Sequence, residues 1–445
     1  MIGRASLFLT ADLPLSLLRW PRHYDGEKCG RHIPMRSTRV SATSVGIHHP
    51  AIWPYRQLDV AALRGEGWEP TPFREFVLKV HQLCNLACDY CYVYEMADQS
   101  WRDRPKLMST AVWQAAARRI AEHVRDHRLT QIGVILHGGE PLLAGPDRLL
   151  RLIADVRAAI PESCTVDIGM QTNGVLLTEN VATRLADAGV RIGVSLDGTA
   201  ESHDRRRRFR NGAGSHAALE RALDLLRSPR LRPAFAGILC TVDVDADPVD
   251  TYESLLRHRP PHIDLLLPHA NWASPPYRPA GRAEAYGRWL IEVFDRWYST
   301  TSQETGIRLF EEIMDLVLGG YSRSEQVGLS PIAVAVVESD GSIEQVDSLK
   351  SAYPGACVTG SSVLTDPFDS ALEHPGVVAR QIGIRALSAE CIECPVHRLC
   401  GAGHYAHRYR PGDGFRHPTV YCDDMLVLIG HIRRRLTADH PEIGT

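Results

Sequence analysis

The sequence has no uninterrupted apolar run of the roughly 18 residues that a membrane-spanning helix needs. Its N-terminal stretch, residues 5–20, is interrupted by Asp12, Pro14 and Arg19, which also argues against a secretory signal peptide. We therefore expect a cytoplasmic protein. A dominant charge is lacking too, because 50 basic and 53 acidic residues give a formal net charge of −3. This balance gives no general reason to expect nucleic acid or a membrane surface as a partner.

The sequence also lacks the cysteine pattern of a secreted disulfide scaffold. Its 11 cysteines are an odd number, and most of them fall in two tight groups. That grouping favours metal ligation in a reducing compartment over disulfide pairing. Internal repeats and low-complexity segments are missing as well. The 445 residues, 44% of them hydrophobic, have the composition of a globular protein with a large core.

Residues 1–70 have weak periodicity and many turn formers, so we expect a loosely packed N-terminal extension of unclear role. The extension contains His23, His32, His48 and His49. These histidines lack a compact ligand spacing, which argues against a metal site there.

From residue 73 onward, short β-rich runs alternate with segments long enough for helices. We expect six strands, at residues 76–80, 132–136, 165–170, 192–196, 235–242 and 263–267, and helices at 110–127, 283–300 and 311–318. This alternation predicts an α/β fold with a parallel sheet, curled into a partial (β/α)6 barrel like a TIM barrel over residues 71–330. A hairpin at 332–346 opens a smaller cysteine-bearing unit, residues 331–435.

Polar or glycine-rich motifs follow the ends of the first four predicted strands. They are residues 81–91, Gly138-Gly139-Glu140-Pro141, Thr172-Asn173-Gly174 and Ser195-Leu196-Asp197-Gly198. Because the active sites of such barrels collect at the carboxyl ends of the strands, we expect these motifs to converge in space.

The first cysteine group, Cys84, Cys88 and Cys91, lies directly after the first predicted strand. Three thiolates can each hold one iron of a four-iron cluster, which leaves the fourth iron open to a chelating ligand. A closed structural zinc site needs four ligands, and this group supplies three cysteines. The alternative to an enzyme is a regulatory or scaffold protein that binds zinc at its cysteines.

The Cys-x3-Cys-x2-Cys spacing, with Tyr90 before the last cysteine, resembles that of the radical S-adenosylmethionine (SAM) superfamily, over about residues 73–430. The resemblance implies an enzyme in which SAM chelates the open iron of a [4Fe–4S] cluster and yields a 5′-deoxyadenosyl radical. It also implies SAM-binding residues: Tyr90 along the adenine, Gly138, Gly139 and Glu140 at the methionine amino group, Thr172, Asn173, Ser195 and Asp197 around the ribose, and Arg207 at the carboxylate. The other arginines of the run 205–210 suit a solvated loop.

A second cysteine group, Cys391, Cys394, Cys400 and Cys422, supplies the four thiolates of a closed site. On these residues alone, zinc and an iron–sulfur cluster fit equally well. The pattern resembles the SPASM extension of peptide-modifying radical enzymes, which implies an auxiliary [4Fe–4S] cluster.

Full SPASM domains carry two auxiliary clusters, and this sequence departs from that pattern. Val346 and His404 stand where cysteines are expected, and only Cys357 remains as a candidate ligand. We therefore expect one auxiliary cluster and a degraded second site filled by ordinary packing; the alternative is a second cluster with Cys357 and His404 as ligands. The remaining cysteines, Cys29, Cys164 and Cys240, are expected to be buried or incidental thiols.

The substrate is predicted from a closer resemblance. Residues 76–81, 91–95, 266–272 and 405–409 resemble the FxsB-type maturases, which form cyclophanes in precursor peptides ending in a Phe-x-Ser motif. This similarity implies a ribosomal precursor peptide, crosslinked between an aromatic ring carbon and the β-carbon of a residue two positions on, and an electron donor such as flavodoxin or ferredoxin. Candidate substrate contacts are Pro268, His269, Asn271 and Trp272.

Asp347 is the candidate base for the ring proton, because it follows the hairpin where the two units should meet. A lone aspartate after a hairpin also suits a surface cap.

Other radical peptide modifications stay open: sulfatase-type formylglycine maturation, thioether formation and epimerisation. Sulfatase maturases have a fuller cysteine set with an acidic residue beside one cysteine, whereas Val358 follows Cys357 here. No leader-binding module is recognisable in residues 1–70.

Overall fold

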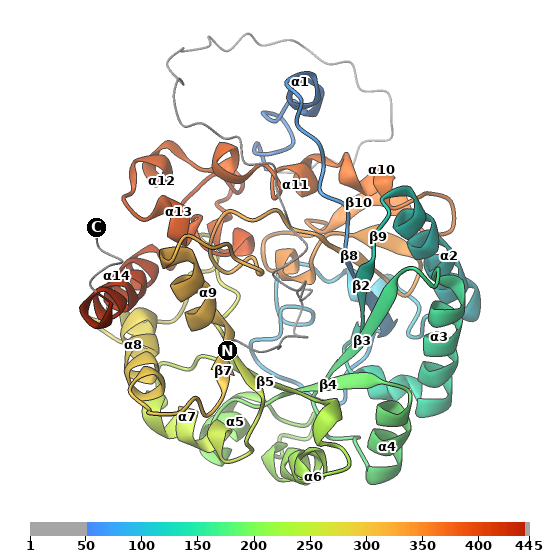
Figure 1. Ribbon diagram of the computed structural model, residues 1–445, viewed down its shortest axis with the longest axis horizontal. Helices are drawn as coiled ribbons and strands as arrows, with labels where there is room; N and C mark the ends of the chain where they lie inside the picture. Colours follow the sequence, from blue (N-terminus) through green and yellow to red (C-terminus); the bar gives the residue numbers. More distant parts are fainter. Residues whose placement is uncertain (1–50, 441–445) are drawn as a thin grey trace.

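The computed structural model describes residues 51–440. The histidines at 23, 32, 48 and 49 and Cys29 lie outside the described residues. Within them, a ring of helices surrounds a curved sheet (Figure 1). No described helix is both long and apolar enough to cross a bilayer.

The six predicted strands are confirmed, and neighbours along the chain pair in parallel. They are β1 (Glu75–His81), β2 (Gln131–Gly138), β3 (Thr165–Thr172), β4 (Val190–Ser195), β5 (Phe235–Thr241) and β6 (His262–Leu266). The strands are buried on both faces because helices cover the outside and the C-terminal unit lies across the open side (Figure 1). This explains their nearly continuous apolar sequences.

Helices follow the strands on the outer face of the sheet. They are α2 (Thr110–Asp126), α3 (Pro146–Ala159), α4 (Glu179–Asp187), α5 (Ala200–Arg206), α6 (His216–Arg227), α7 (Pro248–Leu256), α8 (Ala285–Tyr298) and α9 (Arg308–Val317). Side-chain caps define several of their starts: Ser109 accepts from the Val112 backbone N–H, and Asp247 accepts from that of Asp250. The predicted helices at 110–127, 283–300 and 311–318 are therefore confirmed to within a few residues.

The sheet continues beyond the barrel into the C-terminal unit. Strand β8 (Val334–Val337) pairs in parallel with β1, and β9 (Ser342–Glu344) and β10 (Val358–Ser362) extend it in antiparallel fashion. At the other edge, β7 (Gly306–Ile307) completes the order β10-β9-β8-β1-β2-β3-β4-β5-β6-β7. The predicted hairpin is thus present, and it joins the two units through one sheet.

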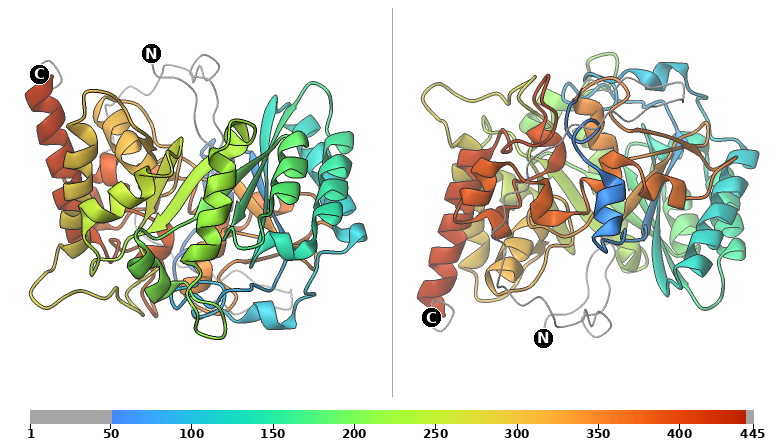
Figure 2. Two further views of the ribbon diagram at one scale, coloured as in Figure 1. Left: turned by 90° about the horizontal axis from the view of Figure 1, so that it is seen from below. Right: turned by 90° about the horizontal axis from the view of Figure 1, so that it is seen from above.

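Short helices and one long helix complete the C-terminal unit. They are α10 (Asp369–Leu372), α11 (Pro375–Val378), α12 (Ala389–Glu393), α13 (His397–Cys400) and α14 (Cys422–Asp439). Helix α14 packs along α8, which ties the end of the chain to the barrel (Figure 2).

Residues 51–70 are packed on the C-terminal unit, so the expectation of a loose extension is wrong for this part. Helix α1 (Val60–Gly65) and the preceding turn place Trp53 and Leu63 in a core shared with Tyr405 and Phe415. Trp53 is only 3% exposed. The sequence pattern missed this because the contact partners are more than 300 positions away.

Candidate functional site

The loop after β1 carries the first cysteine group, and a second loop holds it in place. The backbone N–H of Ala87 donates to Arg208 O at 2.7 Å, and that of Asp89 donates to Arg206 O at 3.2 Å. Burial raises the pKa of Cys84 to about 12, and burial also raises the pKa values of Cys88 and Cys91. Cys88 and Cys91 both add to the rise at Cys84, so the three thiols lie close together. Partly buried thiols of this kind become thiolates when they bind a cationic metal centre, so the group fits an iron–sulfur cluster.

The glycines after β2 allow the strand end to pack tightly against the cysteine loop. A Cβ atom on Gly138 would lie 2.2 Å from His81 O, and one on Gly139 would lie 1.9 Å from Tyr94 Oη. The backbone N–H of Gly139 donates to His81 O at 2.9 Å. No side chain fits at either position without moving the loop.

We expect Gly139→Ala to reduce SAM cleavage by about 100-fold, because the clash displaces the loop that carries the cysteines and small displacements at a reacting centre cost that much. The measurement is 5′-deoxyadenosine formation together with iron content. Gly65→Ala is the control, because a Cβ atom there meets no atom within 4 Å. Full activity of Gly139→Ala would show that the loop tolerates the shift.

Glu140 joins the ends of β2 and β3. Its buried carboxylate accepts from Thr172 Oγ1 at 2.6 Å, from the Asn173 backbone N–H at 2.8 Å and from the Leu142 backbone N–H at 3.1 Å. Burial raises the pKa of Glu140, and these hydrogen bonds oppose the rise. Asn173 Nδ2 in turn donates to Asn85 Oδ1 at 2.8 Å, within the cysteine loop. The predicted convergence of these motifs is confirmed.

Tyr90, Asp197 and Arg207 form one group beside the cysteines, in which Asp197 is buried and the other two are partly buried. Tyr90 Oη donates to Asp197, and Arg207 Nη1 donates to Tyr90 Oη at 2.7 Å. Burial lowers the pKa of Arg207, but the neighbouring Tyr90, Cys88 and Asp197 raise it well above its usual value, so the guanidinium stays charged. Ser195, on the end of β4, accepts from Gln171 Nε2 at 2.9 Å. Arg207 is thus the member of the arginine run that joins this group. Arg210 and Arg206 contact the cysteine loop, because Arg210 Nη2 donates to Cys84 O at 3.2 Å and Arg206 Nη1 donates to Asp89 at 3.1 Å.

Arg207→Lys is expected to weaken SAM binding about tenfold, because a lysine keeps the charge but loses the planar fork that suits a carboxylate. Equilibrium dialysis with SAM measures the effect. The control is the neighbouring Arg208→Lys, since Arg208 is exposed and donates to Asp204 O. Equal affinities of the two variants would contradict a binding role for Arg207.

The second cysteine group is assembled by α12, α13 and the start of α14. Burial, with added repulsion from the neighbouring thiols, raises the pKa of Cys400 to about 12 and that of Cys422 to about 11. Cys391 and Cys394 are close enough to contribute to these shifts. Four thiols at one place fit the predicted closed site. Cys164 and Cys240 are buried free thiols, as predicted.

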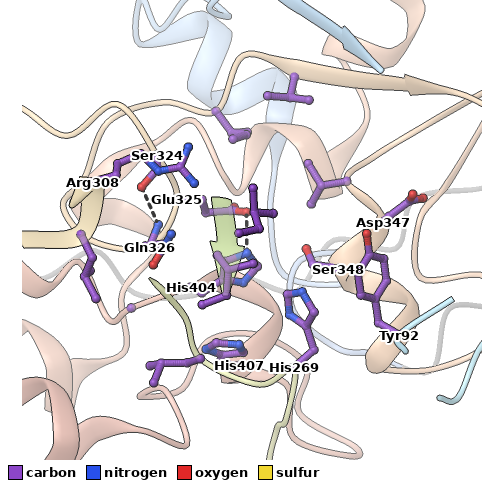
Figure 3. A pocket seen from close by; sticks show the side chains of 18 of the residues that line it. Tyr92, His269, Arg308, Ser324, Glu325, Gln326, Asp347, Ser348, His404 and His407 are labelled. Atoms are coloured by element: carbon purple, nitrogen blue, oxygen red, sulfur yellow. Dashed lines mark hydrogen bonds and ion pairs between the residues drawn. The ribbon is translucent and has the colours of Figure 1, made fainter. Parts of the chain in front are cut away.

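A cavity of about 210 Å³ lies between the barrel and the C-terminal unit (Figure 3). Tyr92, one residue after the last cysteine of the first group, lines it, and so does Asp347. Val346 and His404 also line it, whereas Cys357 is buried in a hydrophobic cluster against which Val346 packs, so ordinary packing fills only part of the expected second cluster site. The cavity is the best candidate for holding a substrate group near the first cysteine group.

The four predicted substrate contacts differ in their surroundings. His269 lines the cavity, with its ring centroid 4.8 Å from that of Tyr92. Asn271 is fully buried and donates to Ser351 O at 2.9 Å, whereas Trp272 donates to Pro418 O at 2.9 Å. Pro268 O accepts from Tyr421 Oη at 2.8 Å. The last three residues therefore join this loop to the C-terminal unit.

Three histidines meet at one end of the cavity. They are His269, His404 and His407 (Figure 3). Burial lowers the pKa of His269 to about 4 and holds those of His404 and His407 well below their usual value. The three rings are therefore neutral at neutral pH.

Asp347 is a buried member of an ionic network and not a surface cap, because it is only 7% exposed. Lys79 Nζ donates to it, and Lys350 Nζ lies 2.9 Å from its other oxygen. Burial alone would raise the pKa of Asp347, but the two lysines hold it well below its usual range. The carboxylate is therefore charged where it faces the cavity.

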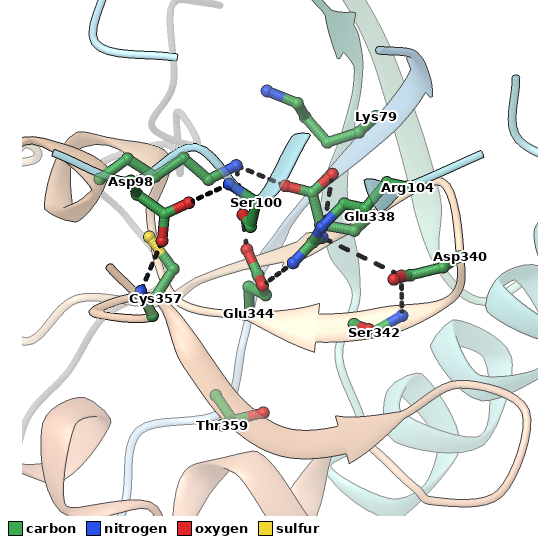
Figure 4. Close-up of polar contacts among 12 residues, drawn as sticks. Lys79, Asp98, Ser100, Arg104, Glu338, Asp340, Ser342, Glu344, Cys357 and Thr359 are labelled. Atoms are coloured by element: carbon green, nitrogen blue, oxygen red, sulfur yellow. Dashed lines mark hydrogen bonds and ion pairs between the residues drawn. The ribbon is translucent and has the colours of Figure 1, made fainter. Parts of the chain in front are cut away.

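The network continues from Lys350 to the protein surface. Lys350 Nζ donates to Glu338 at 2.5 Å, and Arg104 pairs with both Glu338 and Glu344 (Figure 4). Asp340, which is more exposed, lies 4.0 Å from Arg104. Sequence reasoning missed these residues. The available signal was Lys79, a charge inside an otherwise apolar central strand, which needs a buried partner.

Comparisons with known proteins agree with this geometry. Residues 78–255 match the family model described as Radical SAM superfamily. The cysteine-type anaerobic sulfatase-maturating enzyme of Clostridium perfringens (strain ATCC 13124) is 24% identical over 79% of this chain and 94% of that enzyme. The serine-type anaerobic sulfatase-maturating enzyme of Bacteroides thetaiotaomicron is also 24% identical, over 81% of this chain and 89% of that enzyme.

Solved structures share the fold. Native anSMEcpe with bound AdoMet has a TM-score of 0.69 at 22% identity, covering 82% of this chain and 98% of that one. Streptococcus suis SuiB bound to precursor peptide SuiA has a TM-score of 0.55 at 14% identity, covering 88% and 84%. The predicted barrel with a cysteine-bearing C-terminal unit is therefore confirmed as the fold.

Proposed function

We propose that this chain, a radical SAM enzyme whose cofactors are SAM and [4Fe–4S] clusters, oxidises a side chain within a peptide or protein substrate. The observation that carries this proposal is one cavity that meets both Tyr92, beside the first cysteine group, and the charged Asp347. When bound at Cys84, Cys88 and Cys91, the cluster and SAM supply a 5′-deoxyadenosyl radical, which removes a hydrogen atom from carbon.

The chain's own residues have separate tasks in this reaction. The cavity wall positions the substrate carbon and excludes groups that would quench a radical. Asp347 accepts the proton that the substrate loses, while Lys79 and Lys350 keep its carboxylate ionised and oriented. The second cysteine group would hold the cluster that receives the remaining electron. The substrate thus loses one hydrogen atom, one proton and one electron, a two-electron oxidation.

The relatives favour sulfatase-type maturation as the reaction. Two similar curated enzymes are named as cysteine-type and serine-type anaerobic sulfatase-maturating enzymes. In the corresponding reaction of this chain, the β-carbon of a cysteine or serine would be oxidised to an aldehyde. A serine would lose two hydrogens in this reaction. A cysteine would lose its sulfur as sulfide, after hydrolysis of the oxidised side chain.

Cyclophane formation is the second candidate, and three observations favour it. Residues 266–272 and 405–409, which resemble the cyclophane-forming maturases, contribute His269 and His407 to the cavity wall. Aliphatic side chains such as Leu266, Val336 and Val346 line the same cavity, and they suit an aromatic ring of the substrate. A precursor peptide occupies the structurally similar SuiB.

One experiment separates the two reactions. The enzyme is incubated anaerobically with SAM, a reductant and either a sulfatase-motif peptide or peptides encoded near its gene, and the products are analysed by tandem mass spectrometry. A carbonyl trapped by a hydrazine reagent supports sulfatase-type maturation. A loss of two hydrogens confined to an aromatic-containing tripeptide, without a carbonyl, supports the crosslink. Unchanged peptides alongside 5′-deoxyadenosine would rule out both choices of substrate.

A further inference from the structure

We infer that His269, His404 and His407 bind one divalent metal ion, with zinc as the ion that suits them best, at the end of the cavity. One ligand atom from each histidine lies within 4.8 Å of the others. The ring centroids are 4.9 Å apart for His404 and His407, and 5.5 Å and 5.8 Å from His269 to each of them. Figure 3 shows the three side chains near one another; His269 follows β6, whereas His407 belongs to the short 3-10 helix Tyr405–Arg408, which His404 caps.

Two of the histidines have buried nitrogens that lack a partner. His407 is 4% exposed, and its Nε2 atom has no hydrogen-bond partner among the described residues. His269 Nδ1 is also buried, and it also has no hydrogen-bond partner among the described residues. A buried polar atom left unpaired costs about 1–3 kcal/mol, so such atoms usually bind something. Both belong to residues that line the cavity, and a metal ion there would take their lone pairs.

His404 has the surroundings of a metal ligand with a carboxylate behind it. Its Nε2 atom lies 3.8 Å from Glu325, which Arg380 holds by two hydrogen bonds of 2.5 and 2.7 Å. Histidine ligands commonly donate their second ring N–H to a carboxylate, which orients the ring. The backbone N–H of Ala406 donates to His404 Nδ1 at 3.2 Å, and a metal ion would compete with this long bond.

The ligand set points to a mononuclear ion and not to an iron–sulfur cluster. Iron–sulfur clusters are held mainly by thiolates, but Val346 lines this cavity, and the nearby Cys357 Sγ donates to Val346 O at 3.3 Å. Three histidines with a fourth position open to a small ligand are a known zinc arrangement. That open position would face the cavity shared with Tyr92 and Asp347.

The test uses the holoenzyme, with both cysteine groups already loaded with iron–sulfur clusters, and added zinc. Zinc-edge X-ray absorption is expected to show one zinc per chain, with nitrogen and oxygen ligands at about 2.0 Å. A sulfur shell at about 2.3 Å, or no bound zinc, would overturn the proposal, because the metal would then occupy cysteines or no site.

Substitutions test whether the three histidines bind the ion. His407→Ala and His269→Ala should each weaken zinc binding on the order of 100-fold, and Glu325→Gln about tenfold. His137→Ala is the matched control, because His137 is a half-buried histidine of the same cavity outside the group of three. Iron content and cluster absorbance report whether each variant is folded. Folded His407→Ala and His269→Ala proteins with undiminished zinc affinity would overturn the assignment; if neither folds, unchanged affinity of Glu325→Gln would do so.

Discussion

Replacing Cys84 by alanine will abolish SAM cleavage, with formation of 5′-deoxyadenosine falling more than about 1,000-fold, equivalent to about 4 kcal/mol of barrier. Cys84 is one of three clustered thiols, and the two that remain cannot hold a four-iron cluster with a single open iron. Anaerobic reconstitution followed by chromatographic detection of 5′-deoxyadenosine measures the loss. The iron content per chain should fall by about the amount that the cluster at the first cysteine group contributes.

Two cysteine variants serve as controls for this result. Cys164→Ala should retain SAM cleavage, because Cys164 is a buried thiol that precedes β3 and lies outside both cysteine groups. Cys400→Ala should cleave SAM but form little oxidised peptide, because it disrupts only the second group. Cleavage that persists in Cys84→Ala would refute the assignment of the first group.

Asp347→Asn is expected to separate SAM cleavage from product formation. Oxidised peptide should fall by about 100- to 10,000-fold, the usual contribution of a general base, while 5′-deoxyadenosine still forms. The substitution also leaves the buried Lys79 without its ion-pair partner, whereas Lys350 keeps Glu338, and the unpaired charge should cost about 3–5 kcal/mol of folding stability. The measurements are product yield per 5′-deoxyadenosine and the midpoint of thermal unfolding.

Asp340→Asn is the matched control, since Asp340 belongs to the same network at its exposed end and does not line the cavity. It should leave both yields unchanged. Equal loss of SAM cleavage and product in Asp347→Asn would mean that this residue supports the structure and is not the base.

The charge state of Asp347 also gives an expected pH response. Because the lysines depress its folded pKa below the unfolded value, the ion pairs stabilise the fold above the unfolded pKa, and this stabilisation is lost only as the pH falls through the folded value. Product formation should therefore show no acid limb from Asp347 near neutral pH.

The network around Asp347 illustrates what could not be predicted from the sequence. Lys79 is on β1, Arg104 follows it, and Glu338 and Glu344 belong to the hairpin that extends the sheet. Their spacing along the chain follows no motif, because the charges come from distant segments: pairing of β1 with β8 and of β8 with β9 brings Lys79, Glu338 and Glu344 together. Only the buried lysine inside an apolar strand indicated that a partner existed.

The features that could be predicted from the sequence are those whose chemistry is local. The two cysteine groups, the glycines after β2 and the alternation of strands and helices depend on residues close together in the chain, so spacing and periodicity revealed them. Tertiary structure alone decided that the sheet runs on into the C-terminal unit, that Val346 and His404 border a cavity, and that His269 meets His404 and His407. Those features arise from contacts between distant segments, which local patterns do not encode.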